Sequence, residues 1–121
     1  MVYDRASYSQ GSAHQVPQLL ADGDYTTRKV TIASGNTLLK GTVIGKITSG
    51  GKYIKSLSAA SDGSQTPDMI LAQDTDASGG DVEALAYETG KFNYAALTLG
   101  ASHTLASIRE GLRGKGILID D

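Results

Sequence analysis

The acidic segment Asp74-x-Asp76-x-Ser78-Gly79 is the group of residues most suggestive of metal chemistry. Its spacing resembles the start of a calcium-binding loop, in which alternate carboxylates ligate the ion. Such a loop needs an acid at its twelfth position, where this chain has Leu85. We therefore expect an acidic loop over residues 74–81, to which Asp81 and Glu83 add further negative charge and, at most, a weak cation site. No metal is assigned.

Two other patterns fall short of a catalytic motif. Residues 45–52 resemble a phosphate-binding loop, but the spacing is one residue too long and Tyr53 stands where a Ser or Thr would ligate magnesium. A hairpin turn explains this glycine-rich segment better. The histidines are His14 and His103, and neither lies in a G-x-S-x-G nucleophile elbow. We expect no enzyme activity and no cofactor.

Composition narrows the remaining classes of function. Leu, Ile, Val and Phe make up 26 of the 121 residues, so the core is thin and association with copies or a partner would add buried surface. The net charge is −2 without a basic block, which argues against nucleic-acid binding. There is no cysteine, no apolar run of about 20 residues and no signal-peptide core, so we expect a soluble, cytoplasmically made protein without a membrane partner.

Short apolar runs separated by glycine predict a mainly β domain over residues 25–121. The clearest strand candidates are residues 29–32, 42–47, 52–55, 68–72 and 82–89, followed by a turn at Gly90-Lys91. The continuous apolar run over residues 68–72 is typical of a strand covered on both faces. Leu105, Ile108 and Leu112 predict one short helix, capped by Ser102 or Thr104, before a last strand at residues 117–119.

Residues 1–24 differ from the rest because they are polar and lack an apolar period before Val16. They are either a frayed terminus or an arm that becomes ordered on a partner. Tyr3 and Tyr8 favour the arm, since tyrosine is a common anchor at interfaces.

Two segments resemble the phage head decoration proteins, the family of the lambda capsid-stabilising protein D. They are Pro67-Asp68-Met69-Ile70-Leu71-Ala72 and Ala84-Leu85-Ala86-Tyr87-Glu88-Thr89-Gly90-Lys91-Phe92-Asn93-Tyr94. The short helix and the terminal Gly116-Ile117-Leu118-Ile119 complete the pattern. The resemblance implies a β-clip-like small barrel or sheet with one short C-terminal helix and a flexible N-terminal arm over residues 1–24.

The same resemblance implies a homotrimer on the outer surface of an icosahedral phage head, where it stabilises the expanded capsid. The arm would order against the major capsid protein, without enzyme activity or cofactor. The candidate capsid-binding residues are Val2, Tyr3, Tyr8, Val16, Leu19 and Leu20. The alternatives are a β-clip ligand-binding or enzyme domain, and a subunit-interaction domain of another phage assembly.

Overall fold

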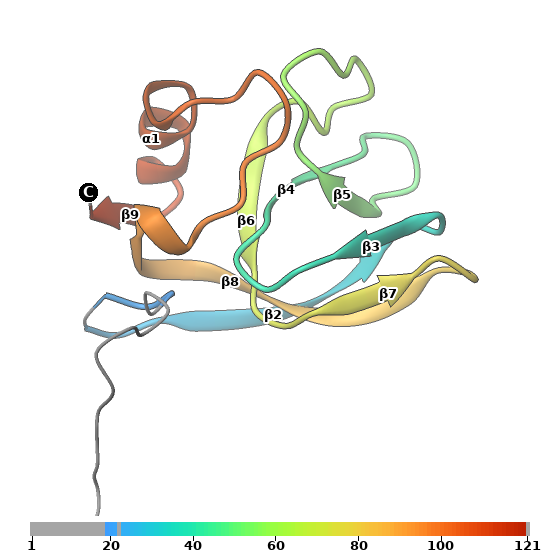
Figure 1. The fold of residues 1–121 in the computed structure, drawn as a ribbon, viewed down its shortest axis with the longest axis horizontal. Helices are drawn as coiled ribbons and strands as arrows, with labels where there is room; N and C mark the ends of the chain where they lie inside the picture. Colours follow the sequence, from blue (N-terminus) through green and yellow to red (C-terminus); the bar gives the residue numbers. More distant parts are fainter. Residues whose placement is uncertain (1–18, 22, 121) are drawn as a thin grey trace, which may run out of the picture.

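The computed structural model describes residues 19–21 and 23–120, which form a small β-barrel with one helix packed beside it (Figure 1). The strands are β2 (Thr26–Ile32), β3 (Asn36–Leu38), β4 (Val43–Lys46), β5 (Tyr53–Lys55), β6 (Pro67–Leu71), β7 (Thr75–Ala77), β8 (Val82–Asn93) and β9 (Ile117–Asp120). The helical elements are the single 3-10 turn η1 (Tyr94–Ala96) and the helix α1 (Leu105–Arg113). The expected mainly β fold with one short C-terminal helix is confirmed.

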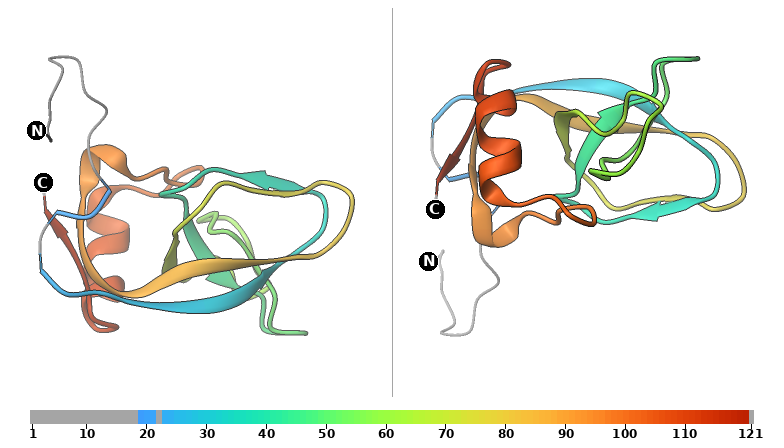
Figure 2. Two further views of the ribbon diagram at one scale, coloured as in Figure 1. Left: turned by 90° about the horizontal axis from the view of Figure 1, so that it is seen from below. Right: turned by 90° about the horizontal axis from the view of Figure 1, so that it is seen from above.

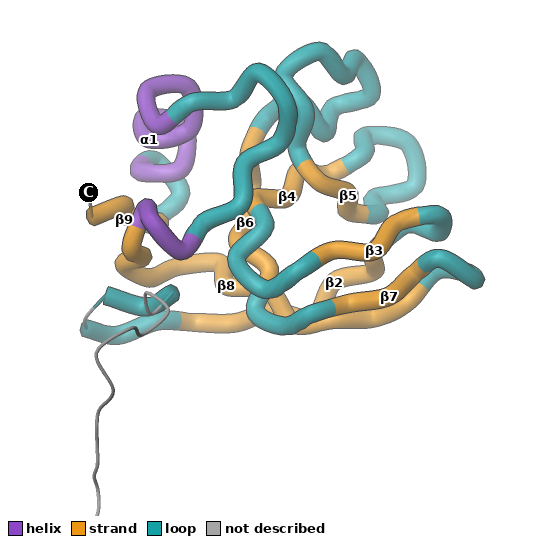
Figure 3. The backbone as a smooth tube through the Cα atoms, viewed as in Figure 1, coloured by secondary structure: helices purple, strands orange, loops and turns teal. Residues whose placement is uncertain are grey.

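Five strands close the barrel in the order β2-β5-β4-β6-β8, because β8 also pairs with β2. This closure leaves the five strands without a free edge. β9 extends the sheet by pairing parallel to the end of β8, and β3 and β7 form a separate two-stranded ribbon at the side (Figure 3). No helix among the described residues is long and apolar enough to cross a lipid bilayer.

β8 is longer than the sequence predicted. We expected a turn at Gly90-Lys91, and this is wrong, since the strand continues to Asn93 and pairs there with β9. Gly90 has φ +148°, and a Cβ atom at this position would lie 3.0 Å from Cζ of Phe92 and 3.1 Å from Cβ of Tyr25. The glycine therefore lets the strand pass directly beneath two aromatic residues, where a side chain would collide.

The buried side chains form two clusters on opposite sides of shared strands. The barrel cluster consists of Val30, Ile32, Leu38, Ile44, Tyr53, Met69, Leu71, Ala77, Ala84 and Ala86. The lobe cluster, beneath α1 and β9, consists of Leu19, Val43, Ile70, Tyr87, Phe92, Ile108, Leu112 and Ile117. Successive residues of β6 alternate between the clusters, so the predicted strand covered on both faces is confirmed.

The predicted helix and two of the three residues of its apolar face are confirmed, while the third, Leu105, is only half-buried. Ile108 and Leu112 are fully buried on the inner face of α1. Thr104 is the N-cap, since its hydroxyl accepts a hydrogen bond from Ser107 N. Ser102, the alternative cap, instead has a positive φ of 68°. Gly116, with φ +90°, turns the chain into β9. Figure 2 shows α1 lying along one end of the barrel.

Two loop predictions have different outcomes. The hairpin turn predicted for residues 45–52 is confirmed, because β4 and β5 pair antiparallel across it. The loop predicted for residues 74–81 is wrong in part, because β7 lies within it and pairs with β3. β7 has only three residues, and its partner is far away in the sequence. The local sequence around residues 75–77 therefore gave little indication of this strand.

Candidate docking surface

The chain enters the described body at Leu19, on the side of the lobe cluster. Leu19 is 7% exposed, and its carbonyl oxygen accepts a hydrogen bond of 2.9 Å from Asn93 N. Ala21 N donates to Lys91 O at 2.8 Å, and Leu20 forms a bridge with Phe92. This short stretch is therefore attached to the end of β8 by backbone bonds on both sides of Leu20.

Of the predicted capsid-binding residues, the structure describes two. Leu19 packs in the chain's own core, while Leu20 is half-buried at its margin. The other four, Val2, Tyr3, Tyr8 and Val16, lie outside the described residues. The boundary of the arm at residue 24 and the role of all six residues stay predictions. Leu19 has a structural use of its own, because it anchors residues 19–21, here called the arm base, in the lobe cluster.

A groove of about 810 Å³ opens beside this base. Six of its ten lining residues are aliphatic, but polar atoms make up about as much of the lining surface as apolar atoms do. The lining residues are Leu19, Leu20, Leu39, Lys40, Asp74, Tyr87, Ala95, Ala96, Leu97 and Thr98. The groove is thus built from the arm base, the β3–β4 and β6–β7 connections, β8 and the segment that follows β8.

Backbone hydrogen bonds hold the walls of the groove in place. Gly41 N donates to Leu71 O at 2.8 Å, and Thr98 N donates to Gly41 O at 2.9 Å. Gly41 has φ +92°, and a Cβ atom there would lie 2.5 Å from Ala96 O. Only glycine permits this close approach of the two walls, so the groove is preformed.

Leu39 is the most exposed large apolar side chain of the described residues, at 59%. Its carbonyl oxygen accepts hydrogen bonds from Thr42 N at 3.1 Å and from Thr42 Oγ1 at 2.6 Å. The neighbouring Lys40 N donates to Asp74 Oδ1 at 2.7 Å. Leu39 is therefore presented to solvent on a turn that hydrogen bonds hold in place.

The acidic segment uses its carboxylates within the chain. Asp74 accepts from Lys40 N, and Asp81 accepts from Ser34 N at 2.8 Å and forms an ion pair with Lys52. Hydrogen bonds from Ser78 and Thr37 lower the pKa of Asp76. Within residues 19–21 and 23–120, no three His, Asp or Glu side chains are grouped to hold a metal ion.

His103 joins the start of α1 to the loop after β5. The Ser107 hydroxyl donates its hydrogen to Thr104 O at 2.9 Å. Its oxygen therefore accepts the hydrogen bond of 3.0 Å from His103 Nδ1. Nε2 then accepts from the Ser56 hydroxyl at 3.1 Å. Ser56 is fully buried, which places its hydroxyl out of reach of a substrate. This pair therefore ties two segments together.

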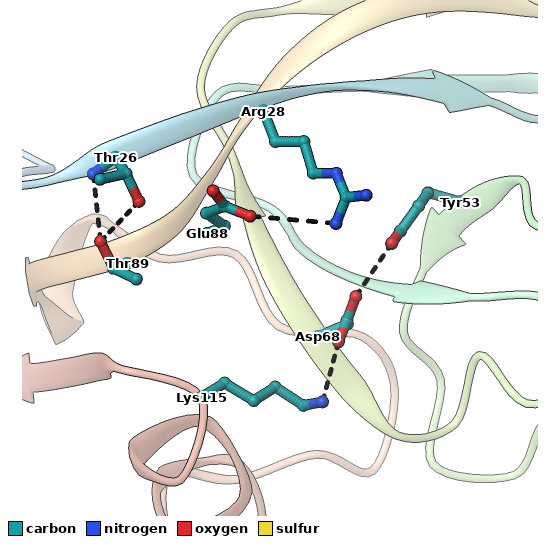
Figure 4. Close-up of polar contacts among 7 residues, drawn as sticks. All are labelled: Thr26, Arg28, Tyr53, Asp68, Glu88, Thr89 and Lys115. Carbon is teal, nitrogen blue, oxygen red and sulfur yellow. Dashed lines mark hydrogen bonds and ion pairs between the residues drawn. The ribbon is translucent and has the colours of Figure 1, made fainter.

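A polar chain links the lobe to the barrel (Figure 4). Lys115 Nζ lies 2.9 Å from one oxygen of Asp68, and the Tyr53 hydroxyl donates to the other at 3.0 Å. Burial, together with the adjacent Asp68 carboxylate, raises the pKa of Tyr53 to about 12. Arg28 and Glu88 form a looser ion pair of 3.9 Å nearby.

Sequence reasoning missed the groove, although one signal for it was present. Leu38 and Leu39 are adjacent at the end of a short strand, and adjacent residues of a strand point to opposite faces. Because Leu38 is buried, Leu39 must point away from the barrel core, toward another contact or toward solvent. The residues of the 95–98 wall gave no comparable signal.

Comparison with known proteins adds one finding to this geometry. The family model described as bacteriophage lambda head decoration protein D matches residues 11–117. A search of curated proteins found no match. The match covers β2 to the start of β9 and includes the arm base, the groove and α1. The chain therefore belongs to the family of bacteriophage lambda head decoration protein D, whose members are structural proteins of the phage capsid.

Proposed function

We propose that this protein binds the outer surface of an icosahedral phage head as a homotrimer and stabilises the expanded capsid. The observation that carries the proposal is the family match over residues 11–117. The major capsid protein is the partner. The protein is made in the bacterial host cytoplasm and joins the virion at the head surface. Neither nucleic acid nor membrane takes part.

The N-terminal arm supplies part of the contact in this proposal. Ordering about ten residues costs roughly 10–20 kcal/mol of backbone entropy, and each main-chain hydrogen bond returns about 1 kcal/mol. One arm therefore binds weakly, even when Val2, Tyr3 and Tyr8 find apolar pockets. Adding a strand to an exposed sheet edge of the capsid protein is the natural binding mode for such a segment.

Trimerisation offsets this weakness. When three arms belong to one particle, the second and third binding events are intramolecular, and avidity gains of about 10²–10⁴ are typical. A trimer also buries surface of a chain whose core is thin. Capsid subunits held by one trimer cannot separate independently, and this is how decoration would stabilise the head.

The function is tested on expanded heads that lack a decoration protein. Heads are challenged with heat or a chelator, with and without the added full-length chain. We expect the protein to co-sediment with the heads and to raise the fraction that survives. Heads that neither retain the protein nor gain resistance would contradict the proposal.

Deletion of residues 1–15 tests the arm. The shortened chain keeps Leu19 and its bonds to β8, so we expect an unchanged melting temperature and oligomer mass. Affinity for heads should fall by about 100-fold, since the avidity of the arms is lost. A chain with residues 1–15 in scrambled order is the matched control for length and charge. Decoration equal to that of the full chain would refute the role of the arm.

A further inference from the structure

We infer that the groove beside the arm base is a second contact with the capsid protein, and that it receives apolar side chains of the same subunit that the arm grips. This inference rests on the proposed function. It identifies a docking surface on the folded body, to which only two of the six residues predicted from the sequence, Leu19 and Leu20, contribute. Its central residue is Leu39, which is 59% exposed at the wall of the groove.

Chain length selects the occupant. Leu19 and Leu20 line the groove, and Val16 is three residues before Leu19. A chain spans at most about 3.6 Å per residue, so Val16 lies within about 11 Å of Leu19 in any conformation. A capsid contact at Val16 would therefore bring the capsid surface close to the groove. A partner held only by the first residues of the arm would not be restrained in this way.

The chemistry of the groove fits an extended protein segment with aliphatic or aromatic side chains. A volume of about 810 Å³ is enough for several such groups. Lys40 and Asp74 are among the lining residues, so the groove also offers polar groups to the backbone of an entering segment. Because the Gly41 contacts fix the walls, binding does not require the groove to form first.

The test compares two exposed leucines in the full-length chain. Leu39→Asp places a charge in the groove, and Leu57→Asp is the matched control, since Leu57 is 40% exposed and lies outside the lining. Affinity for undecorated expanded heads is measured by co-sedimentation over a range of protein concentrations. We expect a loss of about 10- to 100-fold for Leu39→Asp and less than about 2-fold for Leu57→Asp.

Melting temperature and sedimentation mass are measured for both variants, and Leu39→Ser replaces Leu39→Asp if the charge disturbs folding. Wild-type affinity in a folded Leu39 variant, with weak binding by the arm deletion, would overturn the groove inference and leave the proposed function intact. A changed sedimentation mass would show that the groove joins copies of this chain, which also overturns it. Failure of the wild-type chain to bind heads would instead refute the proposed function.

Discussion

The barrel and the lobe bury similar side chains but present different surfaces. The barrel cluster is enclosed by a ring of five paired strands. The lobe cluster is covered by α1, β9 and the arm base, and it leaves the groove open at its margin. The barrel cluster is therefore closed on all sides by paired strands, while the lobe cluster borders an open groove.

The two regions are nevertheless one folding unit, because they share strands. Ile44 of β4 belongs to the barrel cluster and its neighbour Val43 to the lobe cluster. In β6, Ile70 faces the lobe, and Met69 and Leu71 face the barrel. Loss of packing in one cluster therefore removes support from strands on which the other cluster also depends.

The largest expected effect comes from opening the lobe. Phe92 is fully buried there, beside the ring of Tyr87. Phe92→Ala should lower the free energy of unfolding by about 3–5 kcal/mol, through lost burial and the cavity left behind. Urea denaturation, followed by far-UV circular dichroism and tyrosine fluorescence, measures the change. The two probes should give one coincident transition.

A second transition, in which the lobe unfolds while the barrel stays folded, would contradict the conclusion that the two regions form one folding unit. It would show that the lobe unfolds alone despite the strands shared with the barrel. Leu118→Ala is the matched control, since Leu118 is 46% exposed in β9 and should cost little.

A smaller effect is expected at alkaline pH, and it comes from the barrel. The pKa of Tyr53 is raised from 10.0 to about 12, so the folded state favours the neutral phenol. The contribution of the neutral Tyr53 phenol to the free energy of unfolding is fully present below pH 10 and is lost as pH rises through about 12. The loss is roughly 2–3 kcal/mol, from a shift of about two pKa units at 1.36 kcal/mol per unit.

Urea titrations at pH 9, 10 and 11 should show that Tyr53→Phe has a weaker alkaline dependence than the wild type. Tyr94→Phe is the control for removing one phenol from the unfolded chain. Identical pH profiles for Tyr53→Phe and the wild type would refute the assigned role of this hydroxyl.

The smallest effect concerns the polar link between the regions. Lys115→Met removes the ion pair with Asp68, and it should cost at most about 1 kcal/mol because Lys115 is partly exposed. Arg113→Met removes the more exposed pair with Glu110 within α1, and it should cost less. A thermal unfolding series ranks the two variants. Equal costs would mean that Lys115 adds nothing as a link.

Local patterns in the sequence predicted the elements whose causes are local. The run at residues 68–72, the spacing of Ile108 and Leu112, and the capping residue Thr104 each identify an element without knowledge of its neighbours. The continuation of β8 through Gly90 could not be predicted in this way. It depends on Phe92 and Tyr25, which pack over the glycine only in the folded protein.

The candidate docking surface was predictable only in part. The polar composition of residues 1–24 and their tyrosines drew attention to the N-terminal segment. The groove joins Leu19, Leu39 and Leu97, which are distant in the sequence, so no spacing between them could be recognised. Three-dimensional packing created this surface, and the exposed Leu39 identifies it.

The decisive experiment is cryo-electron microscopy of undecorated expanded heads mixed with the full-length chain. The account predicts barrel-shaped density on the outer surface at three-fold positions. In that density Leu39 should contact the capsid protein, and continuous density should run from Leu19 onto the same subunit. Bare heads would contradict the proposed function. Attached protein whose groove faces solvent, with no density leading from Leu19 to the shell, would contradict the proposed contacts of the groove and the arm.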